Sequence, residues 1–286
     1  MQWKSGTSDA DIEDRRGASG GGRIPGGGKG LGLGGLIIVG LLSLVFKQDF
    51  FSLLDQAPDD RSAVATRAQP ESGGTPEEKE RYEFVKFVLN DAQDTWARIL
   101  PPSSPVPYER AKMVLFRGSV KSACGSADAA EGPFYCPSDE KVYLDLGFYD
   151  DLKRDFGAAG DFAQAYVIAH EIGHHVQHLL GAEDEIRRAM GKRGRKANAL
   201  SVQVELQADC LAGVWGHATE QRKLLDRGDV EEALNAAAAI GDDNIQKMSG
   251  DRVQPDAFTH GSSADRVSAF RRGMDSGTLA ACGITK

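Results

Sequence analysis

Hydrophobic and polar positions divide the chain into stretches with different patterns. Residues 1–30 are polar and rich in glycine, so they cannot bury enough apolar surface to order themselves, and we expect a disordered tail there. A continuous apolar run follows, and after it residues 55–75 form a polar linker that contains proline and glycine. Periodic patterning then continues to the end of the chain, which predicts a globular domain over 76–286.

The apolar run from Leu31 to Phe46 contains no charged residue. As a helix it would be about 24 Å long, slightly short of a bilayer core of about 30 Å. Apolar residues continue to Leu54, so we expect a transmembrane anchor over 31–54. The alternatives are a cleaved signal peptide, although the nearest Ala-x-Ala sequence lies well past the run, and a buried core helix, which the Gly-rich approach does not favour.

Positive charge is concentrated before this run. Five Lys and Arg residues precede it, whereas only Lys47 and Arg61 follow closely. The positive-inside rule therefore predicts a single-pass protein of the inner membrane, with a cytoplasmic N-terminus and the domain outside. Disulfides persist in that compartment, and the chain has four cysteines whose three possible pairings stay open: Cys124, Cys136, Cys210 and Cys282.

The domain patterning predicts an α+β fold, mainly helical with a small β-sheet. Thr75, Pro76 and Glu78 provide an N-cap, a first-position proline and a capping box for a helix that should stop at Pro101. Short strands are expected at Met113–Phe116 and Lys141–Asp145, and helices near 161–180, 198–225, 229–247 and 263–274. With a net charge of −8 and a pI near 5.3, no basic surface indicates a nucleic-acid partner.

The sequence His170-Glu171-Ile172-Gly173-His174 lies in the middle of a predicted helix. Four residues turn a helix by about 400°, so His170 and His174 project from one face and can bind one metal ion. Glu171 lies beside that face, where it can act on a metal-bound water. This division of roles is typical of zinc-dependent hydrolysis, in which we expect Glu171 to be the general base.

A catalytic zinc usually has three protein ligands and an open position. Glu205 is the candidate for the third ligand, because its helix is otherwise apolar and a buried carboxylate needs a partner. Asp209, one turn later, could accept a hydrogen bond from the far nitrogen of His170 or His174. A solvated acidic pair on a helix surface is the alternative.

The other histidines have weaker claims. His178 could pair with His174, but no glutamate directly follows His174, and we interpret His175 and His217 as structural. Peptide hydrolysis also needs a donor to the oxyanion, and His260 or Arg266 could serve, although a loop histidine and a surface arginine are equally consistent.

Several runs resemble the bacterial putative neutral zinc metallopeptidases: CGSADAAEGPFYCP, KVYLDLGFYDDL, GDFAQAYVIAHEIGHHVQHLLG, VELQADCLAGVW and FTHGSSADRVSAFRRG. The resemblance spans essentially the whole chain and implies a gluzincin-type zincin with a single N-terminal anchor. It implies His170, His174 and Glu205 as zinc ligands, with Glu171 as the base and Asp209 behind a ligand. FTHGSSADRV is also similar to membrane gluzincins, although Gly261 stands where they have proline.

We therefore expect a zinc endopeptidase that acts on envelope or secreted polypeptides, with the strand Val142–Asp145 as an edge strand that pairs with extended substrate. One alternative is a non-catalytic zinc-binding adaptor or chaperone-like protein, whose site would be closed by His178 or Cys210 as a fourth ligand. A zinc amidase acting on non-peptide amides would use the same chemistry.

Overall fold

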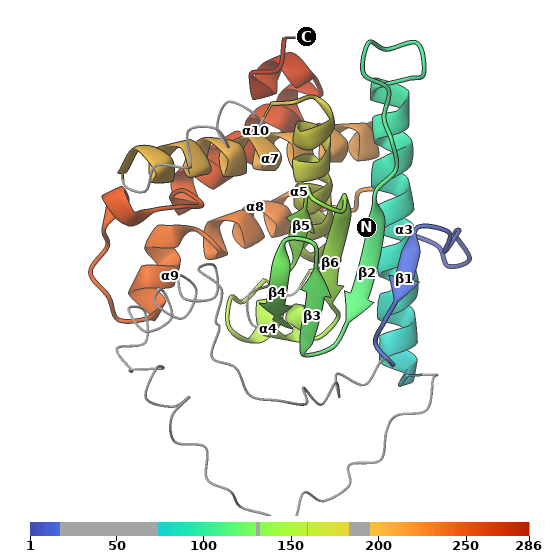
Figure 1. Cartoon of the computed structure of the whole chain (residues 1–286), viewed down its shortest axis with the longest axis horizontal. Coiled ribbons are helices and arrows are strands. Elements are labelled where there is room, and N and C mark those ends of the chain that lie inside the picture. Colours follow the sequence, from blue (N-terminus) through green and yellow to red (C-terminus); the bar gives the residue numbers. More distant parts are fainter. Residues whose placement is uncertain (18–73, 130–131, 159, 183–194, 286) are drawn as a thin grey trace, which may run out of the picture.

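The computed structural model describes residues 1–17, 74–129, 132–158, 160–182 and 195–285. Its elements are, in chain order, β1 (Ile12–Asp14), α3 (Pro76–Ile99), β2 (Lys112–Phe116), β3 (Ser119–Ser122), β4 (Gly125–Asp128), β5 (Phe134–Cys136), β6 (Lys141–Asp145), α4 (Phe148–Arg154), α5 (Asp161–Leu179), α7 (Arg195–Gln221), α8 (Asp229–Ala239), α9 (Asp242–Met248), η2 (Pro255–Ala257), α10 (Ser263–Ser276) and η3 (Leu279–Cys282). The predicted α+β class, mainly helical with small sheets, is confirmed (Figure 1).

Helix α3 begins with the predicted capping box. The Thr75 hydroxyl accepts the backbone N–H of Glu78, and the Glu78 carboxylate accepts the N–H of Thr75, each at 3.2 Å. These bonds satisfy two of the donors that a helix start leaves open. The helix ends at Ile99, just before the Pro101-Pro102 pair that cannot continue it.

The larger sheet has the strand order β1-β2-β6-β5. β1, β2 and β6 are parallel, and β5 runs antiparallel to β6. The prediction that Val142–Asp145 is an edge strand is therefore wrong, because β6 lies between β2 and β5. Its near-continuous run of buried residues is typical of an inner strand covered on both faces. The edges are β1 and β5.

The prediction of a disordered tail over 1–30 is wrong for residues 1–17. β1 pairs with β2 in parallel, and Trp3 packs edge-on against Phe84 of α3 at 5.5 Å between ring centroids. Asp11 is 8% exposed and accepts hydrogen bonds from Arg110 and Lys112. The composition of 1–30 as a whole hid these contacts, because its glycines are concentrated after residue 17.

The predicted anchor over 31–54 lies outside the described residues, as do 18–30 and most of the linker. Among the helices that the structure describes, none has the length and apolar character that a bilayer crossing requires.

Two helices occupy the range predicted as one helix near 229–247. α8 ends at Ala239, and α9 starts at Asp242. Gly241 separates them, and a Cβ there would lie 2.4 Å from the backbone nitrogen of Ser263. The turn therefore brings the start of α9 directly against the start of α10, which matters for the site described below.

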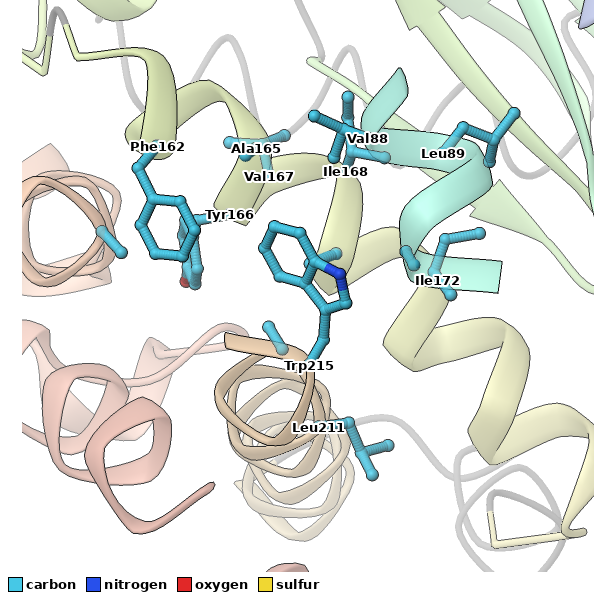
Figure 2. Packing of buried hydrophobic residues seen from close by; sticks show 14 of the residues in the cluster. Val88, Leu89, Phe162, Ala165, Tyr166, Val167, Ile168, Ile172, Leu211 and Trp215 are labelled. Carbon is cyan, nitrogen blue, oxygen red and sulfur yellow. The ribbon is translucent and has the colours of Figure 1, made fainter. Parts of the chain in front are cut away.

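The core lies between α5, α7 and α3 (Figure 2). Trp215 of α7 is fully buried and stacks on Phe162 of α5, with 5.5 Å between ring centroids. Two disulfides, Cys124–Cys136 and Cys210–Cys282, settle the pairing that the sequence left open. The first joins the turn between β3 and β4 to the end of β5, and the second joins α7 to the C-terminal η3.

Candidate metal centre

Helix α5 presents His170 and His174 one turn apart, with ring centroids 4.7 Å from each other. Glu205 of α7 faces both rings. Its Oε2 lies 3.2 Å from His170 Nε2, and its Oε1 lies 3.6 Å from His174 Nε2. The three donor atoms lie within 4.8 Å of one another, so the structure brings together the three residues predicted as metal ligands.

Close contact between the two helices makes this convergence possible. A Cβ at Gly173 would lie 2.9 Å from the backbone oxygen of Ala208 and 3.2 Å from its Cα. Any larger side chain would push α7 away from α5 and carry Glu205 with it. The glycine between the two histidines thus sets the distance between the helices.

Glu171 is 7% exposed and lies beside the two histidines. Burial raises the pKa of its carboxyl, and the charge of Glu205 raises it further, while His170 and His174 oppose the change. A raised pKa suits a carboxylate that must take up a proton during the reaction and release it again.

Asp209 fixes the first histidine, as one of the predicted alternatives required. Its Oδ1 lies 2.8 Å from Nδ1 of His170. Burial opposes ionisation, but the charges of Arg266 and His170 outweigh it and hold the pKa of Asp209 well below its usual range. The ionised Asp209 accepts the Nδ1–H bond, which leaves Nε2 of His170 free to face the metal position.

Gln177 fixes the second histidine, and sequence reasoning did not identify it. Its Oε1 lies 2.9 Å from Nδ1 of His174. Its amide nitrogen donates to Gln207, and Gln207 donates to the backbone oxygen of Cys282, each at 2.9 Å. A chain of hydrogen bonds thus links His174 to the disulfide between α7 and η3.

Arg266 does not lie where the oxyanion prediction requires. Its side chain is 3% exposed, and its Nε and Nη2 donate to Asp209 at 2.9 and 3.0 Å. The guanidinium faces the back of His170 rather than the open side of the cluster. The alternative prediction of a surface arginine is also wrong, because Arg266 is buried where α5, α7 and α10 meet.

His260 lies at the start of α10, and its side chain is 53% exposed. Its Nδ1 lies 3.2 Å from Oδ1 of Asp242. Burial lowers the pKa of His260, but the bond to Asp242 and the charge of Glu205 outweigh it and raise the pKa. Because Nδ1 faces Asp242, Nε2 is the nitrogen left for a ligand.

Asp242 is a residue that sequence reasoning missed. Besides the ring of His260, it accepts the backbone N–H groups of Thr259, His260 and Gly261 at 2.7 to 2.9 Å. It thereby fixes the loop that carries the histidine. An Asp pair directly after Gly241, at a helix start, was the available signal.

The sequence matches the family described as putative neutral zinc metallopeptidase over residues 1–284. The chain belongs to this family. The uncharacterized protein YpfJ of Escherichia coli K12 is 46% identical over 287 residues, which cover 99% of this chain and 98% of the relative. The uncharacterized protein Rv2575 of Mycobacterium tuberculosis H37Rv is 38% identical over 244 residues, 80% of each chain. No solved structure matches the chain significantly.

The family name implies zinc, and the donor set of this chain fits that metal. Two imidazole nitrogens and one carboxylate oxygen form the three-ligand set of catalytic zinc sites, which keep a fourth position open. Each histidine also has the far-side hydrogen bond that is typical of a metal-bound imidazole.

The remaining histidines lie away from the cluster. His175 contacts the backbone oxygen of Glu109 at 2.7 Å and Tyr135 at 3.0 Å, and His217 contacts the backbone oxygen of Met274 at 2.7 Å. His178 lies 3.5 Å from Glu140. Among the described residues, the histidines that converge with a carboxylate as a candidate metal site are His170 and His174, and not the alternative pair of His174 and His178.

Proposed function

We propose that the protein is a zinc-dependent metalloendopeptidase that hydrolyses polypeptides outside the cytoplasm. The observation that carries the proposal is the convergence of His170, His174 and Glu205, with Glu171 buried beside them. When bound, zinc supplies a Lewis acid that lowers the pKa of water to about 7.

Glu171 then accepts the proton of the attacking water and passes it to the leaving amine. His260 donates from Nε2 to the developing oxyanion, while Asp242 accepts from its Nδ1 and the carboxylate beside the ring favours the imidazolium form that carries both protons. Asp209 and Gln177 hold the two imidazoles in the orientation that binding requires.

Strand β5 is the candidate for the substrate-binding edge. It is the outer strand on the side of the sheet next to α5, where Tyr135 contacts His175. An extended polypeptide that pairs with this edge would run beside the helix that carries the metal ligands. This placement favours a polypeptide over a small amide as substrate.

A non-catalytic adaptor would need a site closed by a fourth protein ligand. Cys210 is held in the disulfide with Cys282, and His178 lies against Glu140. Within the described ranges neither candidate joins the cluster, which supports the enzymatic alternative.

The two disulfides suggest an extracytoplasmic domain. Membrane attachment through residues 31–54 stays a prediction. The predicted topology needs residues 1–17 in the cytoplasm and the domain outside, and this conflicts with the pairing of β1 and β2.

The test of the function is Glu171→Gln in the full-length protein. We expect the variant to bind zinc as the wild type does and to lose cleavage of an unfolded protein. Glu220→Gln, at an exposed position of α7, is the matched control and should keep activity. Cleavage by the Glu171 variant at the wild-type rate would refute the mechanism.

A further inference from the structure

Oδ1 of Asp209 has three hydrogen-bond partners from two helices. His170 and Tyr166 of α5 lie 2.8 and 2.5 Å from it, and Nη2 of Arg266 on α10 lies 3.0 Å from it. Nε of Arg266 bonds the other oxygen at 2.9 Å, and Nη2 also reaches the Tyr166 hydroxyl at 3.3 Å. Asp209 is fully buried, and Arg266 nearly so.

A buried carboxylate without partners is strongly destabilised, so its position is set by the donors around it. Tyr166 precedes His170 by one turn on the same face of α5, so its hydroxyl and the imidazole reach the same oxygen. Arg266 brings the compensating charge from a third helix. Neither Tyr166 nor Arg266 belongs to the metal cluster.

We propose that Tyr166 and Arg266 are positioning residues that hold the metal centre through Asp209. Asp209 can orient His170 only while both donors keep its carboxylate in place. The packing of α10 on α7 therefore contributes to metal affinity, although α10 supplies no ligand. The proposal rests on His170 being a zinc ligand and does not depend on peptide hydrolysis.

Two substitutions remove the donors with little change of shape. Tyr166→Phe deletes the hydroxyl, and Arg266→Lys replaces the two-pronged donor by a single ammonium. Zinc affinity of the full-length protein, measured by chelator competition, should fall about 10- to 100-fold in each.

The chain offers a matched control for each change. The Tyr149 hydroxyl is buried and has no hydrogen-bond partner in the described part of the chain, so Tyr149→Phe should leave zinc affinity unchanged. Arg222, directly after the end of α7, forms a two-pronged ion pair with Asp91 of α3, away from the cluster. Arg222→Lys should lower the thermal stability of the zinc-free protein without changing zinc affinity.

Thermal unfolding of the zinc-free variants shows that each is folded before zinc is added. Unchanged zinc affinity in folded Tyr166→Phe and Arg266→Lys would overturn the proposal, as would equal losses in the two controls. If the wild-type protein binds zinc but does not cleave polypeptides, the proposed function is refuted. The comparison of zinc affinities still tests the roles of Tyr166 and Arg266 in that case.

The N-terminal segment carries a second, independent inference. Its strand β1 is paired with β2 at Ile12↔Met113 to Asp14↔Leu115, and the Gln2 N–H donates to the backbone oxygen of Leu224 at 2.7 Å. Glu13 forms an ion pair with Lys141 of β6 at 2.6 Å. The family match also starts at residue 1. Residues 1–17 are thus built into the sheet of the peptidase domain (Figure 1).

We infer that residues 1–17 and the domain from residue 74 onward occupy the same side of the membrane. Hydrogen-bonded strands cannot lie on opposite sides of a bilayer, because the backbone groups of each strand would lose their partners. A chain that crossed the membrane once between residues 17 and 74 would separate β1 from β2.

The test uses single added cysteines at Ser5 and Ser268, both exposed positions, in the full-length protein. A membrane-impermeant maleimide is added to intact cells and, separately, to lysed cells. We expect Ser5→Cys and Ser268→Cys to show the same labelling pattern in both. Labelling of Ser268→Cys in intact cells, with Ser5→Cys labelled only after lysis, would overturn the inference.

Discussion

The disulfide Cys210–Cys282 should contribute more to stability than Cys124–Cys136. The first closes a loop with a sequence separation of 72 residues, and the second one of 12. In the chain-entropy treatment these separations correspond to about 4.4 and about 2.8 kcal/mol at 25 °C. Replacing both cysteines of a pair by alanine should therefore lower the free energy of unfolding by these amounts, the longer loop losing about 1.6 kcal/mol more.

The long-range bridge also lies behind the metal centre. Cys210 follows Asp209 in the chain, and the backbone oxygen of Cys282 holds Gln207, which holds Gln177 behind His174. Loss of this bridge should therefore weaken zinc binding as well as folding. Loss of Cys124–Cys136 should leave zinc binding unchanged, because no hydrogen bond described for the segment between these cysteines reaches the cluster.

Urea unfolding of the zinc-free domain measures the first effect, since bound metal would add its own stabilisation. Chelator competition then measures zinc affinity of the two double-alanine variants under conditions where both are folded. Equal losses of stability, or a larger loss for the short loop, would contradict the entropic reasoning. Equal zinc affinity in the two variants would contradict the proposed link through Gln207.

Three further predictions concern other parts of the structure. His260→Ala should lower kcat about 100- to 1000-fold with zinc content unchanged, and Asp242→Asn should lower it in the same direction. Asp243→Asn, which changes the bonds to Ser263 and the ion pair with Lys247 but no contact with His260, should not. Equal kcat in the two Asn variants would contradict the role of Asp242. Gly173→Ala should lower the free energy of unfolding in urea by about 1–3 kcal/mol and weaken zinc binding, because the added Cβ would lie 2.9 Å from the backbone oxygen of Ala208. Unchanged stability and zinc affinity would show that α5 and α7 can move apart without disturbing the site. Burial opposes ionisation of Asp11, but its hydrogen bonds and ion pairs with Arg110 and Lys112 outweigh burial and lower its pKa. The contribution of Asp11 to the free energy of unfolding is therefore fully present above the unfolded-state pKa of about 4. It is lost as the pH falls through the lower pKa of the folded state. Unfolding free energy measured from pH 7 to pH 3 should show this loss in the wild type and less of it in Asp11→Asn, and identical slopes would exclude the Asp11 ion pairs as its source.

The ligand set could be predicted because it depends on local geometry. Residues four apart on a helix share a face, so His170 and His174, and likewise Glu205 and Asp209, were found by spacing. Tyr166 and Gln177 also lie one turn from a histidine on α5, but spacing alone does not show that they support it, because their other partners come from α7 and α10. Asp242 could not be found by spacing, because it meets His260 only where the start of α9 packs against the start of α10. Arg266 was a predicted site residue, but its burial and its bonds to Asp209 depend on the packing of α10 against α7.

The strand errors have a related cause. The apolar run of β6 indicated a strand but not its neighbours, and β6 is an inner strand because the three-residue β5, which was not among the predicted strands, pairs with it on the side away from β2. β1 itself has only three residues, and two of them, Glu13 and Asp14, are charged. Alternation of apolar and polar positions therefore does not predict a strand there. It is held by its backbone pairing with β2 and by an ion pair with Lys141, neither of which a composition average over 1–30 can show.

The two imidazoles of the metal centre are held in different ways, and this explains why the site needs the C-terminal part of the chain. His170 is fixed by an ionised carboxylate whose charge is balanced from α10, and His174 by a neutral amide whose own partner is held by η3. A carboxylate behind an imidazole raises its basicity more than an amide does, so His170 should be the stronger ligand. The groups that hold these two supports, Arg266 and the backbone of Cys282, lie beyond residue 260, so α5 carries the histidine ligands while α10 and η3 contribute to how firmly they are held.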